Sequence, residues 1–220
     1  MDFTNVDKTR TYIQRSRSSL KFHFGGFKII DEAFNLITPH ICRLKSLTID
    51  APVLSNVLRH LRRPMPLLEK LDINCGHDQD LDNAFFKGGL SSLRELRLHG
   101  VITHFPWKNL SNLRIVDLKL HFRSYRTTKI IDFFASAPLL HTVSLQYSIP
   151  VPFDAPPERI VPLRHLKALT VITDLSPSIL LHHLHIPAGA SVILKFPPKN
   201  AKSPFLDYLP ERSPNFQKPL

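Results

Sequence analysis

The sequence predicts an α/β protein in which a curved parallel β-sheet forms the concave side and helices and loops form the convex side. Three observations predict this fold. A motif of the form L-x-x-L-x-L recurs along the chain, segments with helical spacing of apolar residues lie between its copies, and prolines end most of those segments. The chain has 220 residues, of which 43% are hydrophobic and 21% charged, as in a globular protein that buries a core.

The strands are predicted where the motif recurs. Its second apolar position falls at residues 47, 71, 96, 116, 143 and 169, so successive copies are 24, 25, 20, 27 and 26 residues apart. Leucine-rich repeats are about 20 to 29 residues long and carry L-x-x-L-x-L at the strand. Degenerate copies flank the series at Phe22 and Phe24 and at Val192 and Leu194. The sequence therefore predicts a leucine-rich-repeat solenoid of about seven or eight irregular repeats.

The segments between the strands are predicted to return along the opposite face. Residues 31–41, 55–64, 128–138 and 176–187 have apolar residues at helical spacing, and the last three end at a proline. The returns before Leu96 and Val116 are short or interrupted by proline and are predicted to be loops or single turns. The polar stretch "GHDQDLDN", residues 76–83, is predicted to be a solvated loop. Residues 1–197 then form the leucine-rich-repeat domain, and residues 198–220 form a Pro-rich tail or a truncated further repeat.

Five stretches resemble the leucine-rich-repeat region of basidiomycete (fungal) F-box proteins: "YIQRSRSSLKFHF", "MPLLEKLDI", "FFKGGLSSLRELRLHGV", "FPWKNLSNLRIVDL" and "LHHLHIPAGASVILKF". In that family an F-box docks on a Skp-type adaptor of a cullin (SCF-type) ubiquitin ligase. The resemblance implies that the repeats hold a protein substrate and have no catalytic role. The F-box itself is missing from the sequence, so the chain is expected to start downstream of it. A Skp-type adaptor is expected to bind only if an F-box lies upstream.

The repeat register predicts which residues face a partner. Side chains alternate along a strand, so the residues between the buried ones face the concave surface. This surface carries five basic and four acidic residues in the predicted columns, which is the pattern of a mixed protein-binding surface. The candidate protein-binding residues are those in the middle of the sheet: Asp72, Glu95, Arg97, His99, Asp117, Lys119, Ser144 and Gln146.

The net charge of +11 leaves a second function open. Because the concave columns account for +1, most of the excess is predicted in segments such as "RHLRRP", "HFRSYRTTK" and "QRSRSSLK". One alternative is a basic nucleic-acid-associated protein that uses its convex or N-terminal arginines. Another is a truncated F-box-protein remnant without activity.

The sequence predicts neither an enzyme nor a cofactor, because it has no P-loop, nucleophile elbow or H-E-x-x-H motif. His182 and His185 share a helical face but have no third metal ligand at suitable spacing, so a partly exposed helix end is predicted there. Cys42 and Cys75 are predicted to be reduced. With no long apolar run or secretory leader in the sequence, the protein is expected in the cytoplasm or nucleus, away from membranes.

Overall fold

The structure, a computed structural model of the chain, describes residues 6–16, 19–25, 35–51, 62–81, 90–103, 110–119, 127–146, 159–173 and 177–196. The chain divides into two compact units, Met1–Leu110 and Ser111–Leu220. Both units are built on parallel strands with helices, which confirms the predicted α/β class. The single domain of residues 1–197 stays a prediction, and the tail of residues 198–220 lies outside the described residues.

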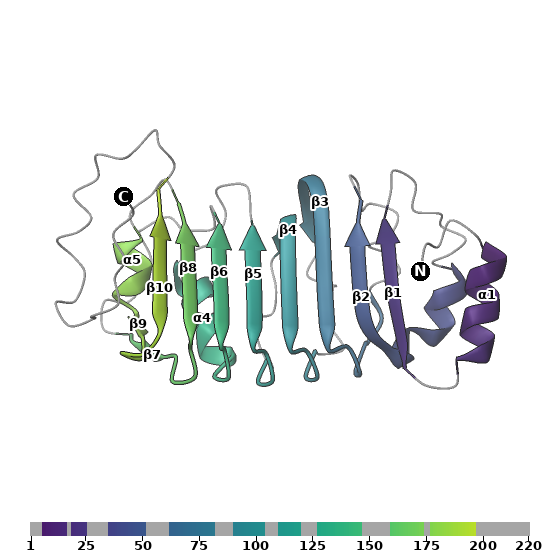
Figure 1. Cartoon of the computed structure of the whole chain (residues 1–220), viewed down its shortest axis with the longest axis horizontal. Helices are drawn as coiled ribbons and strands as arrows, with labels where there is room; N and C mark the ends of the chain where they lie inside the picture. Colours follow the sequence, from purple (N-terminus) through teal and green to yellow (C-terminus); the bar gives the residue numbers. More distant parts are fainter. Residues whose placement is uncertain are drawn as a thin grey trace. The chain divides into compact units, whose positions relative to one another are not determined.

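In the first unit, four strands lie side by side in chain order and point in the same direction (Figure 1). They are β1 (Leu20–Gly25), β2 (Leu44–Asp50), β3 (Lys70–Leu81) and β4 (Glu95–Thr103). Leu47, Leu71 and Leu96 are direct neighbours in the register, and each is at most 1% exposed. Truncating one such leucine to alanine removes buried area and leaves a cavity, which costs about 2–5 kcal/mol. These positions are the recurring motif leucines, so the predicted strands are confirmed here.

The second unit repeats this arrangement. Its four parallel strands are β5 (Ile115–Lys119), β6 (Thr142–Gln146), β8 (Ala168–Ile172) and β10 (Ser191–Lys195), again in chain order. Val116, Val143 and Leu169 are neighbours in the register and are at most 1% exposed. A separate parallel pair joins β7 (Val161–Pro162) to β9 (Leu184–His185).

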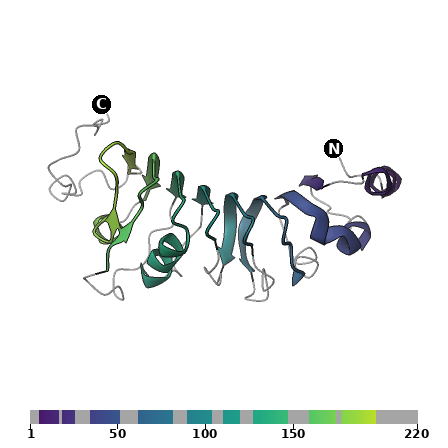
Figure 2. The same ribbon diagram turned by 90° about the horizontal axis from the view of Figure 1, so that it is seen from below.

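Helix α4 (Thr127–Ser136) covers one face of the second unit's sheet (Figure 2). It occupies the predicted helical segment 128–138. Ile130, Ile131, Phe133 and Phe134 form its buried stripe, and none is more than 2% exposed. Burial of each of these side chains contributes about 1.5–3 kcal/mol. The described polar strand residues of the opposite face are exposed or half-buried.

The predicted helix of residues 31–41 is confirmed in part. Residues 35–37 are helical and lead into a 3₁₀ helix, η1 (Thr38–Arg43). Pro39 lies in the first turn of η1 and has no amide hydrogen to donate, which favours a short helix over a longer α-helix. Ile37 and Ile41 are buried, as the predicted apolar stripe requires.

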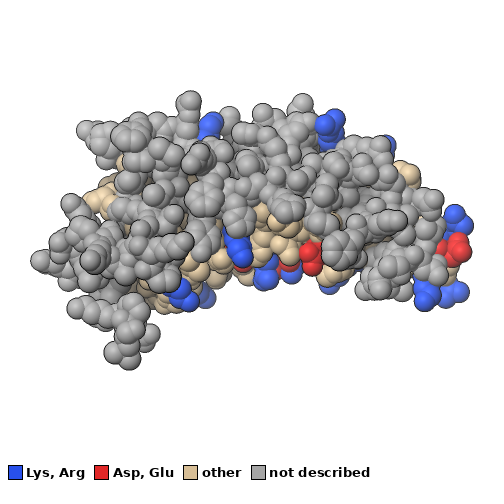
Figure 3. Space-filling view, turned by 90° about the horizontal axis from the view of Figure 1, so that it is seen from above, with Lys and Arg blue, Asp and Glu red and all other residues tan. Residues whose placement is uncertain are grey.

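Helix α1 (Val6–Arg15) was not predicted and lies beside β1 (Figures 1 and 2). Ile13 is buried, and the ring of Tyr12 meets that of Phe22 edge-on with centroids 6.1 Å apart. Asp7 in the first turn and Arg15 in the last turn complement the helix dipole. Lys, Arg, Asp and Glu atoms gather on its outer side, at the right of Figure 3. The helix therefore shields the apolar residues of β1 with one stripe and meets solvent with the other.

Two further predictions were wrong. Residues 76–81 are the second half of β3 and not a loop, because Gln79, Asp80 and Leu81 pair with β4. Helix α5 (Ser178–Leu181) ends well before Pro187, and the chain then forms β9. The backbone N–H of Val161 donates to the carbonyl of His183 at 2.8 Å, so pairing with β7 replaces the last helical turns.

The remaining predicted returns fall largely outside the described residues. These are the helix of residues 55–64, apart from 62–64, and the loops before Leu96 and Val116, apart from the turns that directly precede those strands. None of the helices in the described part of the chain is long and apolar enough to cross a bilayer.

Candidate protein-binding face

Each sheet has an open face, which is the side turned away from η1 or α4. The strand residues between the buried positions lie on it, and nearly all of those described are exposed or half-buried. Three rows cross the first unit: Lys21, Ser46, Lys70 and Glu95; His23, Thr48, Asp72 and Arg97; Gly25, Asp50, Asn74 and His99. Three rows cross the second: Ile115, Thr142, Ala168 and Ser191; Asp117, Ser144, Thr170 and Ile193; Lys119, Gln146, Ile172 and Lys195. This is the register that the repeat spacing predicts.

A network of charged side chains lies on the open face of the first unit. Glu95 Oε1 is 2.8 Å from Arg97 Nη2 and 3.2 Å from Lys70 Nζ. Lys70 Nζ is also 3.9 Å from Asp72 Oδ2. The alternation of strand side chains places Lys70 and Asp72 on the same face, and the register places Glu95 and Arg97 opposite them. The four residues form one network, here called the charge network.

The charge network is only partly covered by protein. The side chain of Glu95 is 20% exposed and that of Arg97 is 43% exposed. Ion pairs with this exposure contribute about 0.2–1 kcal/mol each, so the network adds little to stability. Its larger effect is to hold long side chains in fixed positions, which lowers the entropy lost when a partner binds.

Two polar atoms of this network retain hydrogen-bonding capacity. Arg97 Nε and Glu95 Oε1 are both buried, and neither has a hydrogen-bond partner with good geometry in the part of the chain that the structure describes. The ion-pair distances to Glu95 Oε1 are short, but proximity of charges does not require hydrogen-bond angles. Because both atoms are buried, a partner would contact the exposed parts of these side chains, which belong to a guanidinium that donates and a carboxylate that accepts.

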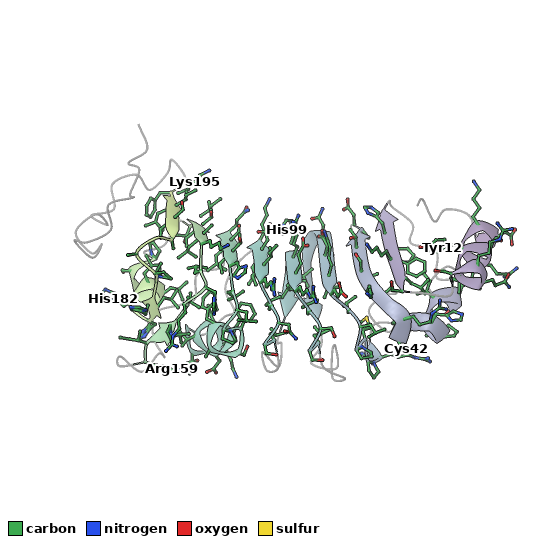
Figure 4. All side chains as sticks on the ribbon, turned by 60° about the horizontal axis from the view of Figure 1, so that its bottom comes forward. Tyr12, Cys42, His99, Arg159, His182 and Lys195 are labelled. Carbon is green, nitrogen blue, oxygen red and sulfur yellow. The ribbon has the colours of Figure 1, made fainter. Side chains whose placement is uncertain are left out.

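Polar groups also gather where the strands of the first unit end. Asn74 Nδ2 donates to Asp50 Oδ1 at 3.1 Å, and both residues are exposed. His99 follows them in the same row and is half-buried (Figure 4). This end offers amide, carboxylate and imidazole groups in one line.

The predicted site residues fall into two groups. Asp72, Glu95, Arg97 and His99 lie together on the open face of the first unit. Asp117, Lys119, Ser144 and Gln146 lie together on that of the second, where Asp117 is level with Ser144 and Lys119 is level with Gln146. All eight are half-buried.

One functional candidate was missed. Lys70 is in contact with two of the predicted residues, but the predicted site did not include it. The alternating signs of Lys70, Asp72, Glu95 and Arg97 in the sequence were the signal, because the repeat register already paired these positions.

The two cysteines and the histidines of residues 182–185 differ in their surroundings. Burial raises the pKa of the Cys75 thiol to about 12, and the nearby Asp50 carboxylate adds to the effect. His182 and His185 are exposed, whereas His183 is buried with Nδ1 2.8 Å from the carbonyl of Arg159. Among the described residues no three His, Cys, Asp or Glu side chains lie close enough together to bind a metal ion.

Comparison with known proteins gives no relative: no family model, curated protein or solved structure matches this chain.

Proposed function

We propose that this chain is a non-catalytic leucine-rich-repeat module that binds a protein through its open face. By its resemblance to basidiomycete F-box proteins, it would be the substrate-recognition part of a receptor in an SCF-type ubiquitin ligase. The Skp-type adaptor would then contact an F-box and not the repeats. The proposed site of action is the cytoplasm or nucleus.

The charge network is the observation that carries this proposal. It consists of half-buried side chains of both signs, held in register on the open face, with two buried polar atoms that have no hydrogen bond of good geometry among the described residues. Such a surface favours a partner with its own alternating donors and acceptors, because charge complementarity sets specificity and orientation. A protein segment carries both kinds of group in close succession.

The proposal gives a chemical description of the bound surface. Arg97 requires a carboxylate or carbonyl acceptor, and its planar guanidinium favours a bidentate carboxylate. Glu95, already beside two cations, would accept a further hydrogen bond from a donor such as an amide, hydroxyl or ammonium group. A uniformly anionic or uniformly cationic ligand matches only one half of the network and leaves the other half repelled.

A charge-swapped variant tests this surface. Arg97→Glu combined with Asp117→Lys leaves the net charge unchanged and reverses one open-face charge in each unit. The matched control swaps Asp7→Lys and Arg10→Glu, an exposed ion pair on α1 with its atoms 3.5 Å apart. The experiment compares the proteins that each tagged form retains from the same cell extract, quantified by mass spectrometry.

The wild type and the α1 control are expected to retain a common set of proteins that the open-face variant loses. Retention of every partner by the open-face variant would show that this face is not the binding surface. Circular dichroism of all three forms checks that the substitutions leave the fold intact.

A further inference from the structure

A row of basic residues lies at the amino ends of the strands in the second unit. Arg114, His141 and Lys167 each precede a strand, at the same position of the repeated motif. The backbone N–H of His141 donates to the carbonyl of Arg114, and that of Lys167 donates to the carbonyl of His141, both at 2.8 Å. The three residues are therefore direct neighbours on adjacent strands, with about 4.8 Å between successive strands.

The turn before β8 adds two more basic groups. His165 lies in this turn, and its ring centroid is 6.2 Å from that of His141. Arg164 is the preceding residue, and both side chains are exposed, as are those of Arg114 and Lys167. The basic edge is defined as these five residues: Arg114, His141, Arg164, His165 and Lys167.

In the equivalent row of the first unit, the positive charge is balanced by an acidic residue of the protein itself. There the same motif position holds Lys45, Glu69 and Arg94, joined by the same backbone hydrogen bonds at 2.8 Å. The signs alternate, and Lys45 Nζ is 3.3 Å from Glu69 Oε1. In the second unit the middle residue is a histidine, so no carboxylate stands between Arg114 and Lys167.

The described surroundings of the basic edge are not acidic. The charges that act on His141 come from Lys167, Arg114 and His165, and all of them oppose its protonation. The carboxylates in the described part of this unit are Asp117, on the open face, and Asp132, which is paired with Arg159. Arg114 and Lys167 lie two strands apart with His141 between them, so the row gathers positive charge on one short edge, and an anionic ligand would be attracted to it.

We propose that the basic edge binds an acidic segment of a partner protein. The row covers three strands, a length of about 10 Å, which matches about three residues of an extended peptide at 3.3 Å each. Clustered basic residues are a common means of recognising acidic motifs. The surface lies at the amino ends of the strands, so the proposal stands independently of the open-face site.

A nucleic acid fits these observations less well. Single-stranded binders combine a long basic groove with aromatic side chains on which bases stack. Within the basic edge, the rings are the imidazoles of His141 and His165. The short, ring-poor row therefore favours a short acidic peptide.

Fluorescence anisotropy at low salt measures the affinity of the protein for two labelled probes, octaglutamate and a twelve-nucleotide oligothymidine. Labelled octaglutamine is the uncharged control. The edge variant is Arg114→Glu with Lys167→Glu. The matched control is Lys129→Glu with Lys195→Glu, which changes the net charge equally within the same unit. Lys129 is in the first turn of α4, and Lys195 lies at the opposite end of β10 from the basic edge (Figure 4).

Octaglutamate is expected to bind the wild type and the control with similar affinity and the edge variant at least about tenfold more weakly, since two exposed charge contacts become repulsive. The milder Arg114→Gln with Lys167→Gln variant is expected to fall between them, and it provides the same test if the glutamate variant does not fold. Equal affinity in the edge and control variants would overturn the assignment of this edge. Tighter, edge-dependent binding of oligothymidine would overturn the choice of a protein segment.

Discussion

Gly100 is the position where a single methyl group should be most damaging in the first unit. Its φ is +64°, in the left-handed region that residues with a Cβ adopt at a cost of about 1–2 kcal/mol. A Cβ added there would lie 2.2 Å from the carbonyl oxygen of Cys75, whereas carbon–oxygen contacts normally start at about 3.3 Å. The glycine occurs where the β3–β4 register shifts between Asn74 and Gln79, so the two strands approach closely at an irregular point.

The expected cost of Gly100→Ala follows from these two terms. Backbone strain contributes about 1–2 kcal/mol, and forcing two buried strands apart by about 1 Å contributes about 1–3 kcal/mol, as in overpacked cores. The free energy of unfolding should therefore fall by about 2–5 kcal/mol. Gly189→Ala is the matched control, because no atom lies within 4 Å of its added Cβ. That substitution should change stability by no more than about 1 kcal/mol.

Urea unfolding followed by circular dichroism measures both changes, and hydrogen exchange of the β4 amides reports the first unit locally. A Gly100→Ala protein within about 0.5 kcal/mol of the wild type would refute the close approach of β3 and β4. An equal loss in Gly189→Ala would show that the effect is not specific to this site.

Three further results are expected. Alanine substitutions of Lys70 and Glu95, singly and together, should give a coupling energy of about 0.5–1 kcal/mol that becomes smaller in 1 M salt. Urea unfolding measures this coupling energy. A coupling energy of zero at low salt would show that the ion pair does not form. Desolvation and basic neighbours lower the pKa of His141 below its usual 6.5. Below pH 6.5 the unfolded chain therefore binds more protons than the folded chain, and the free energy of unfolding should fall as the pH drops from 6.5 through the lowered pKa. NMR titration gives that pKa directly, a value above 6.5 would contradict the result, and His141→Gln should reduce the slope of stability with pH. Cys42 is exposed and should react with a thiol reagent in the native protein. Cys75, with a pKa of about 12, should be only about one part in 10⁴ thiolate at pH 8 and should react only after unfolding. Rapid labelling of Cys75 in the native protein would contradict its burial.

The strands and their register were predictable because the repeat imposes them. Each motif copy buries its apolar positions on one side, and stacking copies leaves a single alignment in which Leu47, Leu71 and Leu96 meet. The open-face rows follow from that alignment without further information. Helix α4 was predictable for a similar reason, since its paired apolar residues leave one buried stripe.

The missed elements depend on contacts between distant residues. Helix α1 has few apolar residues, and the packing of Tyr12 against Phe22 and the burial of Ile13 are seen only once the helix lies beside β1. The two-residue strands β7 and β9 form because each offers backbone groups to the other, which no local pattern reveals. Gly100 is one of seven glycines in the sequence, and its positive φ and the approach of Cys75 are seen only in the structure.

The basic edge was hidden for a different reason. The excess positive charge was predicted in arginine-rich stretches such as "RHLRRP" and "HFRSYRTTK", most of which lie outside the described residues. Arg114, His141 and Lys167 are 27 and 26 residues apart in sequence, and their alignment appears only when the strands are placed side by side. The repeat register predicted which residues share the open face, whereas the ion pairs among Lys70, Asp72, Glu95 and Arg97 are seen only in the structure.

Site-specific photo-cross-linking tests the central claim, that the open face binds a protein. A benzoylphenylalanine is placed in turn at Asn74 and Ile193, which are exposed on the open face, and at Gln14 and Ala135, which are exposed on α1 and α4. Irradiation in cells should yield cross-links to the same partner from the two open-face positions and none from the two helix positions. Cross-links from Gln14 or Ala135 alone would contradict the account and place the binding surface on the helices.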